Sequence, residues 1–291
     1  MKIEEVGIIG SGQMGNGIAH VSALAGYRVV LIDIAEDALS KAIKTIENNL
    51  KRQVQKERIS QEDMDKALSR ISTNTDSKAL KNADLIIEAA TENFDLKVKI
   101  FKGILEYIKK DCLLSTNTSS LSITKLAAST DRPENFIGLH FMNPVPVMKL
   151  VEIIPGIATS DEMLDTTKTF ARSLGKTIAT SKDFPAFIAN RIIFPMINEA
   201  IYTLYEGIGD IESIDTSMKL GMGHPMGPLA LADFIGLDTC LSILNVLHEG
   251  FGDSKYSPCP LLVKYVEAGW YGVKSGKGFY DYSGKAPLPT R

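Results

Sequence analysis

The sequence predicts an α/β protein in which a doubly wound, mostly parallel sheet is followed by a second, all-helical domain. Short apolar runs alternate with helical patterns as far as about residue 185, which is typical of repeated strand–helix–strand units. Beyond that point the pattern becomes almost entirely helical. We therefore expect one domain over residues 1–185 and another over residues 186–291.

Length and composition limit the possible classes of protein. The chain has 291 residues, of which 44% are hydrophobic, so it can bury a core in each of two domains. Its net charge of -3 argues against a nucleic-acid-binding protein, whose surface is basic. The three cysteines are widely spaced, without a metal-ligand pattern, which suits a reduced cytoplasmic protein. We find no secretory segment and no apolar stretch long enough to cross a bilayer, so we expect no membrane association.

The first strand–helix unit contains a glycine-rich loop. The apolar run 6–9 is followed by Gly10-Ser11-Gly12-Gln13-Met14-Gly15 and then by a helical pattern, which places G-x-G-x-x-G between a strand and a helix. Gly10 allows the tight turn, Gly12 lets a pyrophosphate approach the backbone, and Gly15 lets the helix pack against the strand. The helix N-terminus then presents unpaired N–H groups to the phosphates. This context predicts a Rossmann-like dinucleotide-binding domain; the alternative is a glycine turn that serves packing alone.

The second strand, over residues 28–32, ends on Asp33. This is about the separation from the glycine loop at which a ribose-binding acid is found. A carboxylate there accepts hydrogen bonds from the ribose hydroxyls and repels a 2′-phosphate. We therefore expect NAD as the cofactor, with NADP less favoured.

A long helical pattern over residues 36–70 exceeds the length of a usual crossover connection. The residues Ser60-Gln61-Glu62-Asp63 resemble a capping box and indicate that a second helix begins there. We interpret this segment as a two-helix arm that projects from the nucleotide-binding domain. Arg52 and Lys56 lie one helical turn apart and could bind the phosphates of a large anionic substrate. An ordinary solvated helix face explains the same spacing equally well.

Polar side chains follow the next strands of the predicted sheet. Glu92 comes after the strand at 85–89, and Asn117 and Ser119 come after the strand at 113–116. Because ligands of open α/β sheets bind beyond the carboxyl ends of the strands, we expect these side chains to face the cofactor crevice. Serine and threonine are also common in such loops because they cap helices. No base adjoins Ser119 in a nucleophile motif, which argues against a serine hydrolase.

A histidine ends the sixth apolar run. The run 136–139 leads to His140, and a proline-containing turn separates it from a second run at 150–154. Two such runs indicate adjacent antiparallel strands, and pairing centred near Pro146 places His140 opposite Glu152. A carboxylate beside an imidazole fixes its tautomer and stabilises its charged form, as a general base requires. The alternative is a strand-end histidine with a solvated glutamate.

The last elements divide the two expected domains. A helix at 161–174 and a strand at 177–180 complete the first domain. The following segment, 188–205, is apolar on more than one face, so we expect its own domain and a second subunit to bury it. Asn190 near its start could hydrogen-bond a substrate oxygen, or it could serve only the start of the helix.

Several of these blocks together resemble the 3-hydroxyacyl-CoA dehydrogenases, and most of all the short-chain bacterial 3-hydroxybutyryl-CoA dehydrogenases. The resemblance runs from end to end of the chain. The blocks that carry it are Gly10-Ser11-Gly12-Gln13-Met14-Gly15, Ser115-Thr116-Asn117-Thr118-Ser119-Ser120-Leu121, His140-Phe141-Met142-Asn143-Pro144 through Leu150-Val151-Glu152, Phe187-Ile188-Ala189-Asn190-Arg191, and the tail Lys274-Ser275-Gly276-Lys277-Gly278-Phe279-Tyr280.

The resemblance implies an oxidoreductase of fatty acid and butanoate metabolism that transfers a hydride between NAD and the CH–OH group of a 3-hydroxyacyl-CoA, without a metal. It implies that His140 is the catalytic acid and base, with Glu152 as its partner, and that Ser119 and Asn190 contact the substrate oxygen. The cofactor-binding residues expected are Gly10, Gly12, Gln13, Met14, Gly15, Asp33, Glu92, Lys97, Asn117, Ser119 and Asn143. Family members are typically dimeric through the helical domain.

The arm positions Arg52 and Lys56 match those that bind the phosphates of coenzyme A in the family, although arginine replaces one lysine here. This replacement keeps the charge but alters the geometry. Two other functions remain open. One is a dehydrogenase of the same fold for a free hydroxy acid or sugar acid, against which the arm argues. The other is a non-catalytic dinucleotide-binding protein, against which the complete set of His140, Glu152 and Asn190 argues.

Overall fold

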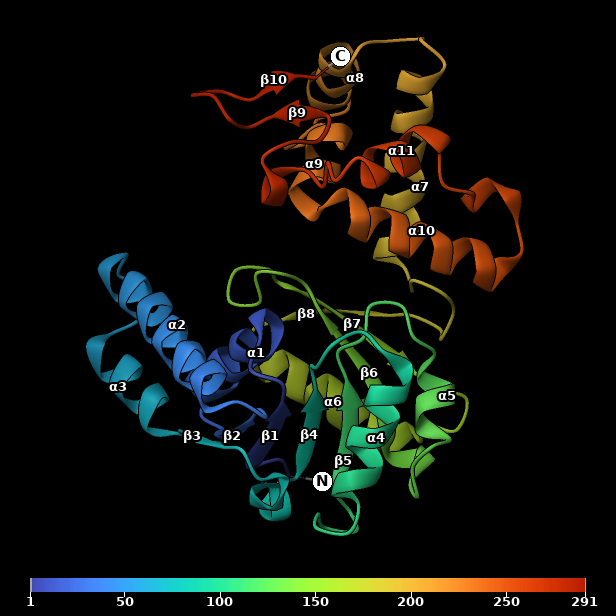
Figure 1. Cartoon of the computed structure of the whole chain (residues 1–291). Helices are drawn as coiled ribbons and strands as arrows, with labels where there is room; N and C mark the ends of the chain where they lie inside the picture. Colours follow the sequence, from blue (N-terminus) through green and yellow to red (C-terminus); the bar gives the residue numbers. More distant parts are fainter. Residues whose placement is uncertain (1, 291) are drawn as a thin grey trace. The chain divides into compact units, whose positions relative to one another are not determined.

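The computed structural model describes residues 2–290, which form two compact units (Figure 1). One unit ends at Phe184 and the other begins at Pro185, next to the boundary expected from the sequence. Among the described residues, eight strands of the first unit form one sheet in the order β3-β2-β1-β4-β5-β6-β7-β8. The strands are β1 (Glu5–Ile9), β2 (Arg28–Ile32), β3 (Ile71–Asn74), β4 (Leu85–Glu88), β5 (Leu113–Thr116), β6 (Phe136–Phe141), β7 (Leu150–Pro155) and β8 (Thr177–Thr180).

The sheet is mostly parallel, as predicted, because only the β6–β7 pair runs antiparallel. Helices α1 and α6 cover one face and α4 and α5 cover the other (Figure 1), which is the doubly wound arrangement. Strands β4, β5 and β6 are buried along their whole length, because both of their faces lie under helices. The helices of this unit outside the arm are α1 (Gln13–Leu24), α4 (Phe94–Ile104), α5 (Ile123–Ala127) and α6 (Asp161–Ser173).

The expected arm consists of two helices, α2 (Glu36–Gln55) and α3 (Gln61–Ser69). The predicted capping box is confirmed: the side chain of Ser60 accepts from the backbone N–H of Asp63, and the carboxylate of Asp63 accepts from the N–H of Ser60, both at 3.0 Å. The arm also packs against α1. One stripe of α2 belongs to the same hydrophobic core as α1 and is fully buried; its residues are Leu39, Ala42, Ile46 and Leu50.

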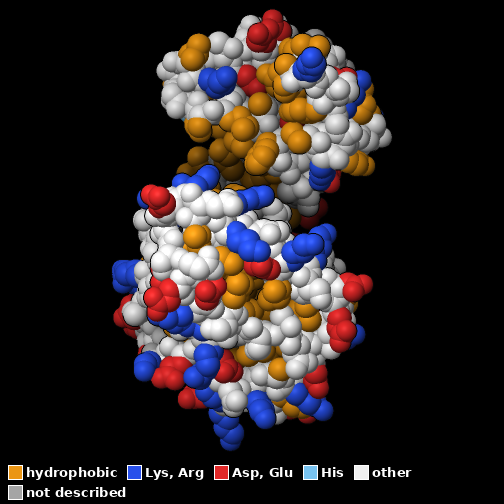
Figure 2. All heavy atoms as spheres, turned by 90° about the vertical axis from the view of Figure 1, so that its left-hand side faces the viewer, with side chains coloured by type: hydrophobic (Ala, Val, Ile, Leu, Met, Phe, Trp, Pro, Cys, Tyr) orange, Lys and Arg blue, Asp and Glu red, His pale blue; other side chains and the backbone are white. Residues whose placement is uncertain are grey.

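The second unit has a hydrophobic core of its own. Its helices are α7 (Ala189–Tyr205), α8 (Ile211–Thr216), α9 (Pro228–Ile235), α10 (Leu237–Phe251) and α11 (Pro260–Glu267), and a small pair of strands follows, β9 (Tyr280–Asp281) with β10 (Leu288–Pro289). Within the described residues, no single helix is long and apolar enough to cross a membrane. Helices α9 and α10, which are bent relative to each other, would together be long and apolar enough, judged by length and composition only. In Figure 2, hydrophobic side chains gather on this unit, which is uppermost in the view.

Two buried carboxylates hold the tail of the chain on the second unit. Asp233 accepts hydrogen bonds from the backbone N–H groups of Phe279 at 2.9 Å and Tyr280 at 2.8 Å. Asp215 accepts a bond of 2.8 Å from the hydroxyl of Tyr280. Burial raises the pKa of Asp233 to about 6, and its hydrogen bonds oppose this effect only in part.

Candidate active site

The glycine-rich loop joins β1 to α1 and leaves the N-terminus of the helix open. A Cβ atom on Gly15 would lie 1.7 Å from the carbonyl oxygen of Gly10, so only glycine fits there. A Cβ atom on Gly12 would meet nothing within 4 Å, and no side chain caps the helix at this position. The protein's own packing therefore explains the glycine at position 15, whereas Gly12 borders the open space that a phosphate group could enter.

A pocket of about 560 Å³ lies beside this loop. It combines the glycine loop, the strand end at Asp33, one face of α2 and the turn after β6. The lining residues are Ser11, Gly12, Gln13, Asn16, Gly17, Asp33, Ala38, Lys41, Ala42, Thr45, Asn49, Asn143, Pro144, Val145 and Pro146. The expected cofactor residues Gly12, Gln13, Asp33 and Asn143 thus share one pocket, and α2 supplies polar side chains that sequence reasoning did not assign to it.

Asp33 is held by the loop that it faces. Its Oδ2 accepts from the backbone N–H of Ser11 at 2.8 Å and from the Ser11 hydroxyl at 2.7 Å. Partial burial alone would raise the pKa of Asp33, but the hydrogen bonds from Ser11 and neighbouring backbone groups outweigh it and lower the pKa. The group is therefore a carboxylate at neutral pH and can accept hydrogen bonds from a ribose.

His140 and Glu152 lie opposite each other on β6 and β7, so the predicted cross-strand pairing is confirmed. The Nδ1 atom of His140 lies 2.8 Å from Oε2 of Glu152. Both residues are buried, with 7% of His140 and 1% of Glu152 exposed. Because an ionised carboxylate can only accept, the imidazole places its proton on Nδ1, and Nε2 becomes its basic nitrogen.

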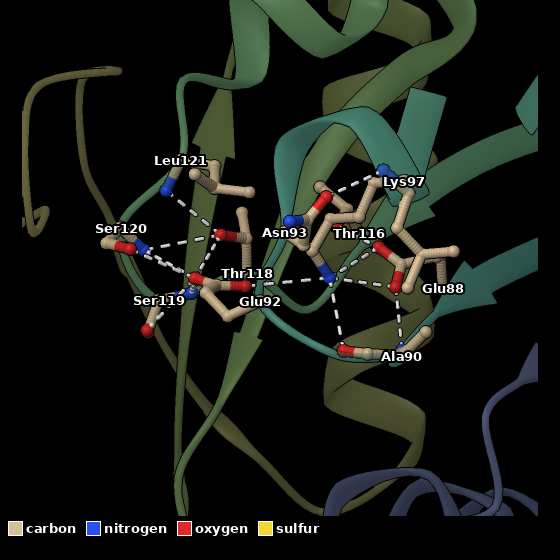
Figure 3. Close-up of polar contacts among 11 residues, drawn as sticks. Glu88, Ala90, Glu92, Asn93, Lys97, Thr116, Thr118, Ser119, Ser120 and Leu121 are labelled. Carbon is tan, nitrogen blue, oxygen red and sulfur yellow. Dashed lines mark hydrogen bonds and ion pairs between the residues drawn. The ribbon is translucent and has the colours of Figure 1, made fainter. Parts of the chain in front are cut away.

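Glu92 organises the loop that follows β5 (Figure 3). Its Oε1 accepts from the hydroxyl of Thr118 at 2.6 Å, from the N–H and hydroxyl of Ser119 at 2.9 and 3.2 Å, and from the N–H and hydroxyl of Ser120 at 3.2 and 3.0 Å. Burial alone would raise the pKa of Glu92, but these donors and the charge of Lys97 lower it. Two residues expected in the cofactor site, Glu92 and Ser119, are therefore in direct contact.

Lys97, which we expected in the cofactor site, is buried in the structure, and its part in cofactor binding stays a prediction. Its side chain is 1% exposed, and its ammonium lies 2.8 Å from both carboxylate oxygens of Glu88 and 3.5 Å from Oε2 of Glu92. Lys97 lies on α4, and its ammonium points toward the carboxylates of Glu88 and Glu92 (Figure 3). Sequence reasoning missed Glu88, although a carboxylate directly after the apolar run 85–87 was a visible signal.

Asn117 binds the protein itself. Its Oδ1 accepts from the backbone N–H of Phe141 at 2.9 Å, which joins the end of β5 to the residue after His140. The side chain therefore positions the end of β6, a role that the sequence did not predict.

The residues expected to bind the substrate are distributed over the chain. Arg52 lies in the last turn of α2, and Lys56 is the first residue after that helix; both are exposed. Ser119 lies beside Glu92, in the first unit. Asn190 occupies the first turn of α7, in the second unit, and is half-buried.

Comparison with known proteins identifies the family. Residues 5–184 match the NAD-binding domain of 3-hydroxyacyl-CoA dehydrogenase, and residues 187–282 match the C-terminal domain of the same enzyme. A 3-hydroxybutyryl-CoA dehydrogenase of Bradyrhizobium diazoefficiens is 61% identical over 289 residues, which covers 99% of each chain. The human mitochondrial hydroxyacyl-coenzyme A dehydrogenase is 42% identical over 287 residues, which covers 96% of this chain and 91% of that protein.

The fold agrees with a solved structure of the same family. The crystal structure of (S)-3-hydroxybutyryl-CoA dehydrogenase from Ralstonia eutropha superposes with a TM-score of 0.95 at 49% identity, and the match covers 97% of this chain and 100% of that one. Both domains of the family are thus present in the expected order, together with its glycine loop. The chain belongs to the 3-hydroxyacyl-CoA dehydrogenases, a family of NAD-dependent oxidoreductases.

Proposed function

We propose that this protein is an (S)-3-hydroxybutyryl-CoA dehydrogenase, which reversibly transfers a hydride between NAD(H) and a 3-hydroxyacyl-CoA/3-ketoacyl-CoA pair. The observation that carries the proposal is the buried His140–Glu152 pair at 2.8 Å, in the same unit as an NAD-type glycine loop. The relatives named 3-hydroxybutyryl-CoA dehydrogenase support the four-carbon substrate. This substrate would place the reaction in fatty acid and butanoate metabolism.

The residues of the first unit fit a bound NAD. The open N-terminus of α1 at Gly12 suits the pyrophosphate, and the carboxylate of Asp33 suits the adenosine ribose. Gln13, Met14 and Asn143 would complete the walls of the site, with Glu92 and Ser119 toward the ends of β4 and β5. When bound, the nicotinamide accepts the hydride that leaves carbon 3 of the substrate.

His140 moves the proton of this reaction. In oxidation, its Nε2 takes the proton of the 3-hydroxyl group as the C–H bond breaks and the C=O bond forms. The imidazolium is stabilised by the carboxylate of Glu152, which lies 2.8 Å from Nδ1. In reduction, the imidazolium returns the proton to the alkoxide. The buried carboxylate also holds the ring in one orientation, so no reorientation is needed between the two directions.

Polar side chains would orient the substrate around this base. We expect the hydroxyl of Ser119 and the amide of Asn190 to contact the substrate oxygen. Arg52 and Lys56 are exposed near the end of α2 and could bind the phosphates of coenzyme A. A free hydroxy acid would not use these two cations, which is why we favour the thioester.

The decisive experiment is NADH oxidation with acetoacetyl-CoA, followed at 340 nm, compared with free acetoacetate and with longer 3-ketoacyl-CoAs. We expect turnover of acetoacetyl-CoA and almost none of the free acid. Preference for the free acid would support the hydroxy-acid dehydrogenase instead. NADH binding without oxidation by any acyl-CoA would indicate a non-catalytic dinucleotide-binding protein.

We also infer a homodimer through the second unit. Large apolar side chains are exposed there: Ile192 at 66%, Ile208 at 74%, Leu220 at 81%, Met222 at 68% and Phe234 at 65%. Exposed apolar groups of this size favour burial by a second copy of the chain. Sedimentation velocity should give a dimer, and Leu220→Asp should shift it toward monomer.

The three cysteines are free and buried, which supports a reducing, cytoplasmic setting.

A further inference from the structure

We propose that Glu88 and Lys97 are positioning residues, which fix the carboxylate of Glu92 and, through it, the hydroxyl of Ser119. The proposal deepens the proposed function and rests on it in one respect, namely that Ser119 contacts the substrate oxygen. The four side chains come from the end of β4, the loops that follow β4 and β5, and helix α4 (Figure 3).

Glu88 is a rigid anchor. It is fully buried, and each of its carboxylate oxygens accepts 2.8 Å bonds from the ammonium of Lys97. Its Oε1 also accepts from the N–H of Ala90 at 2.6 Å, and its Oε2 accepts from the hydroxyl of Thr116 at 2.7 Å. The donors belong to β5, to α4 and to the loop after β4, so the carboxylate cannot move without breaking bonds to all three segments.

Lys97 connects Glu88 to Glu92. Its ammonium is held by Glu88 and by the carbonyl oxygen of Ala90 at 3.3 Å, and it lies 3.5 Å from Oε2 of Glu92. The longer distance means that the cation attracts Glu92 without drawing its carboxylate away from the loop. Oε2 therefore faces the cation while Oε1 faces the loop that contains Ser119.

The acceptor Oε1 of Glu92 has more donors than it can satisfy at once. Three hydroxyls and two backbone N–H groups lie within 3.2 Å of this one atom, whereas a carboxylate oxygen has about two lone-pair sites. The hydroxyl of Ser119, at 3.2 Å, is among the longest of these contacts, while its own N–H is held at 2.9 Å. The backbone of Ser119 is thus fixed, and its hydroxyl is released at little cost to donate to a substrate oxygen.

The arrangement requires Glu92 to stay ionised. A protonated carboxyl would become a donor and would no longer hold the loop. The groups that face Glu92 are the hydroxyls of residues 118–120, the N–H groups of Ser119 and Ser120, and the ammonium of Lys97, with Glu88 on the far side of that cation. The hydrogen bonds and Lys97 together lower the pKa of Glu92, although its burial alone would raise it.

The first variant to test is Lys97→Met, which keeps an unbranched side chain only one atom shorter and removes its charge. We expect kcat with NADH and acetoacetyl-CoA to fall on the order of 10- to 100-fold, because Ser119 is displaced, and KM to change less than threefold. The pKa of Glu92 should rise without its cation, so NADH affinity and kcat should decline at a higher pH than in the wild type. Loss of a purely structural ion pair would not change the pH at which NADH affinity and kcat decline on acidification.

The matched control is Lys109→Met, whose ammonium pairs with a carboxylate at the other end of β4. Lys109 pairs with Asp84 at 2.6 Å, just before β4 begins, and removing it should leave kcat and the pH profile unchanged. Glu88→Gln is the second test. It should also lower kcat. The pH at which kcat and NADH affinity decline on acidification should not rise, because Lys97 then pairs with Glu92 alone. Thermal unfolding followed by circular dichroism shows whether each variant is folded.

The proposal is wrong if folded Lys97→Met has the kcat, NADH affinity and pH profile of the wild type. It is also wrong if neither variant folds, since the pair would then be an element of stability alone. NADH affinity as a function of pH, measured by NADH fluorescence, needs no substrate. If the wild type binds NADH but oxidises it with no acyl-CoA, the proposed function is refuted. The pH dependence of NADH binding in the variants still tests the positioning of Glu92.

Discussion

Glu152 and Glu88 are both buried carboxylates at the same edge of the sheet, but their partners differ. Glu152 lies 2.8 Å from the imidazole of His140, which takes up and returns a proton in the proposed reaction. Glu88 binds the ammonium of Lys97 and two neutral donors. A carboxylate beside an imidazole suits proton transfer, whereas a carboxylate beside an ammonium suits rigid positioning. The residue type is the same, and the partner decides the role.

The largest effect should follow from breaking the proton-transfer pair. His140→Gln removes the base, and Glu152→Gln removes the charge that stabilises the imidazolium. Each should lower kcat by roughly 100- to 10,000-fold while the dissociation constant of NADH changes little. Steady-state kinetics and a fluorescence titration with NADH measure both. His248→Gln, on helix α10, is the control and should leave kcat unchanged. Full activity in either variant would refute the assignment of the acid and base.

A third buried carboxylate, Asp233, sharpens the comparison because its hydrogen bonds come from neutral donors. Burial raises its pKa to about 6 from 3.8, so its neutral form is favoured in the folded state. The stability linked to this group is complete below about pH 4 and is lost as the pH rises through 6. A shift of about 2 units corresponds to about 3 kcal/mol.

Asp233→Asn should therefore become more stable relative to the wild type by about 3 kcal/mol between pH 4 and pH 7. Urea unfolding followed by the fluorescence of Trp270, the single tryptophan, reports on this unit. Glu267→Gln, which removes an exposed carboxylate, is the control. A difference in stability that does not vary with pH would show that Asp233 is ionised normally.

Asp33 has a smaller expected effect because it is only half-buried. Asp33→Ala should weaken NAD binding about tenfold, through the loss of hydrogen bonds to a charged acceptor, and should affect NADP less. Because the pKa of Asp33 is lowered, NAD affinity of the wild type should stay constant down to about pH 5. Asp37→Ala, in the exposed first turn of α2, is the control. An unchanged ratio of NAD to NADP affinity would exclude Asp33 as the ribose-binding acid.

The smallest effect is expected for the exposed cations of the arm, which form no ion pair among residues 2–290. Arg52→Ala combined with Lys56→Ala should raise KM for acetoacetyl-CoA about 3- to 10-fold with little change in kcat, since exposed charges contribute weakly. The effect should diminish at high salt. Lys66→Ala, which removes an exposed lysine of α3, should leave KM unchanged. An unaltered KM in the double variant would remove the arm from the substrate site.

The features that the sequence determined by itself depend on near neighbours along the chain. Two examples are the glycine loop between β1 and α1 and the capping box of Ser60 and Asp63. The pairing of His140 with Glu152 also belongs here, because a short turn between antiparallel strands sets which residues are opposite each other. Such features need only local spacing and the geometry of one hairpin.

Other features were decided by the tertiary structure alone. The contact of buried Lys97, on α4, with Glu88, at the end of β4, was not predicted from the sequence. Asn117 bonds the backbone of Phe141, and α2 packs against α1 through a buried apolar stripe. Contacts of this kind join elements that are distant in sequence. They depend on how helices and strands pack in three dimensions, which the periodicity of a single segment does not encode.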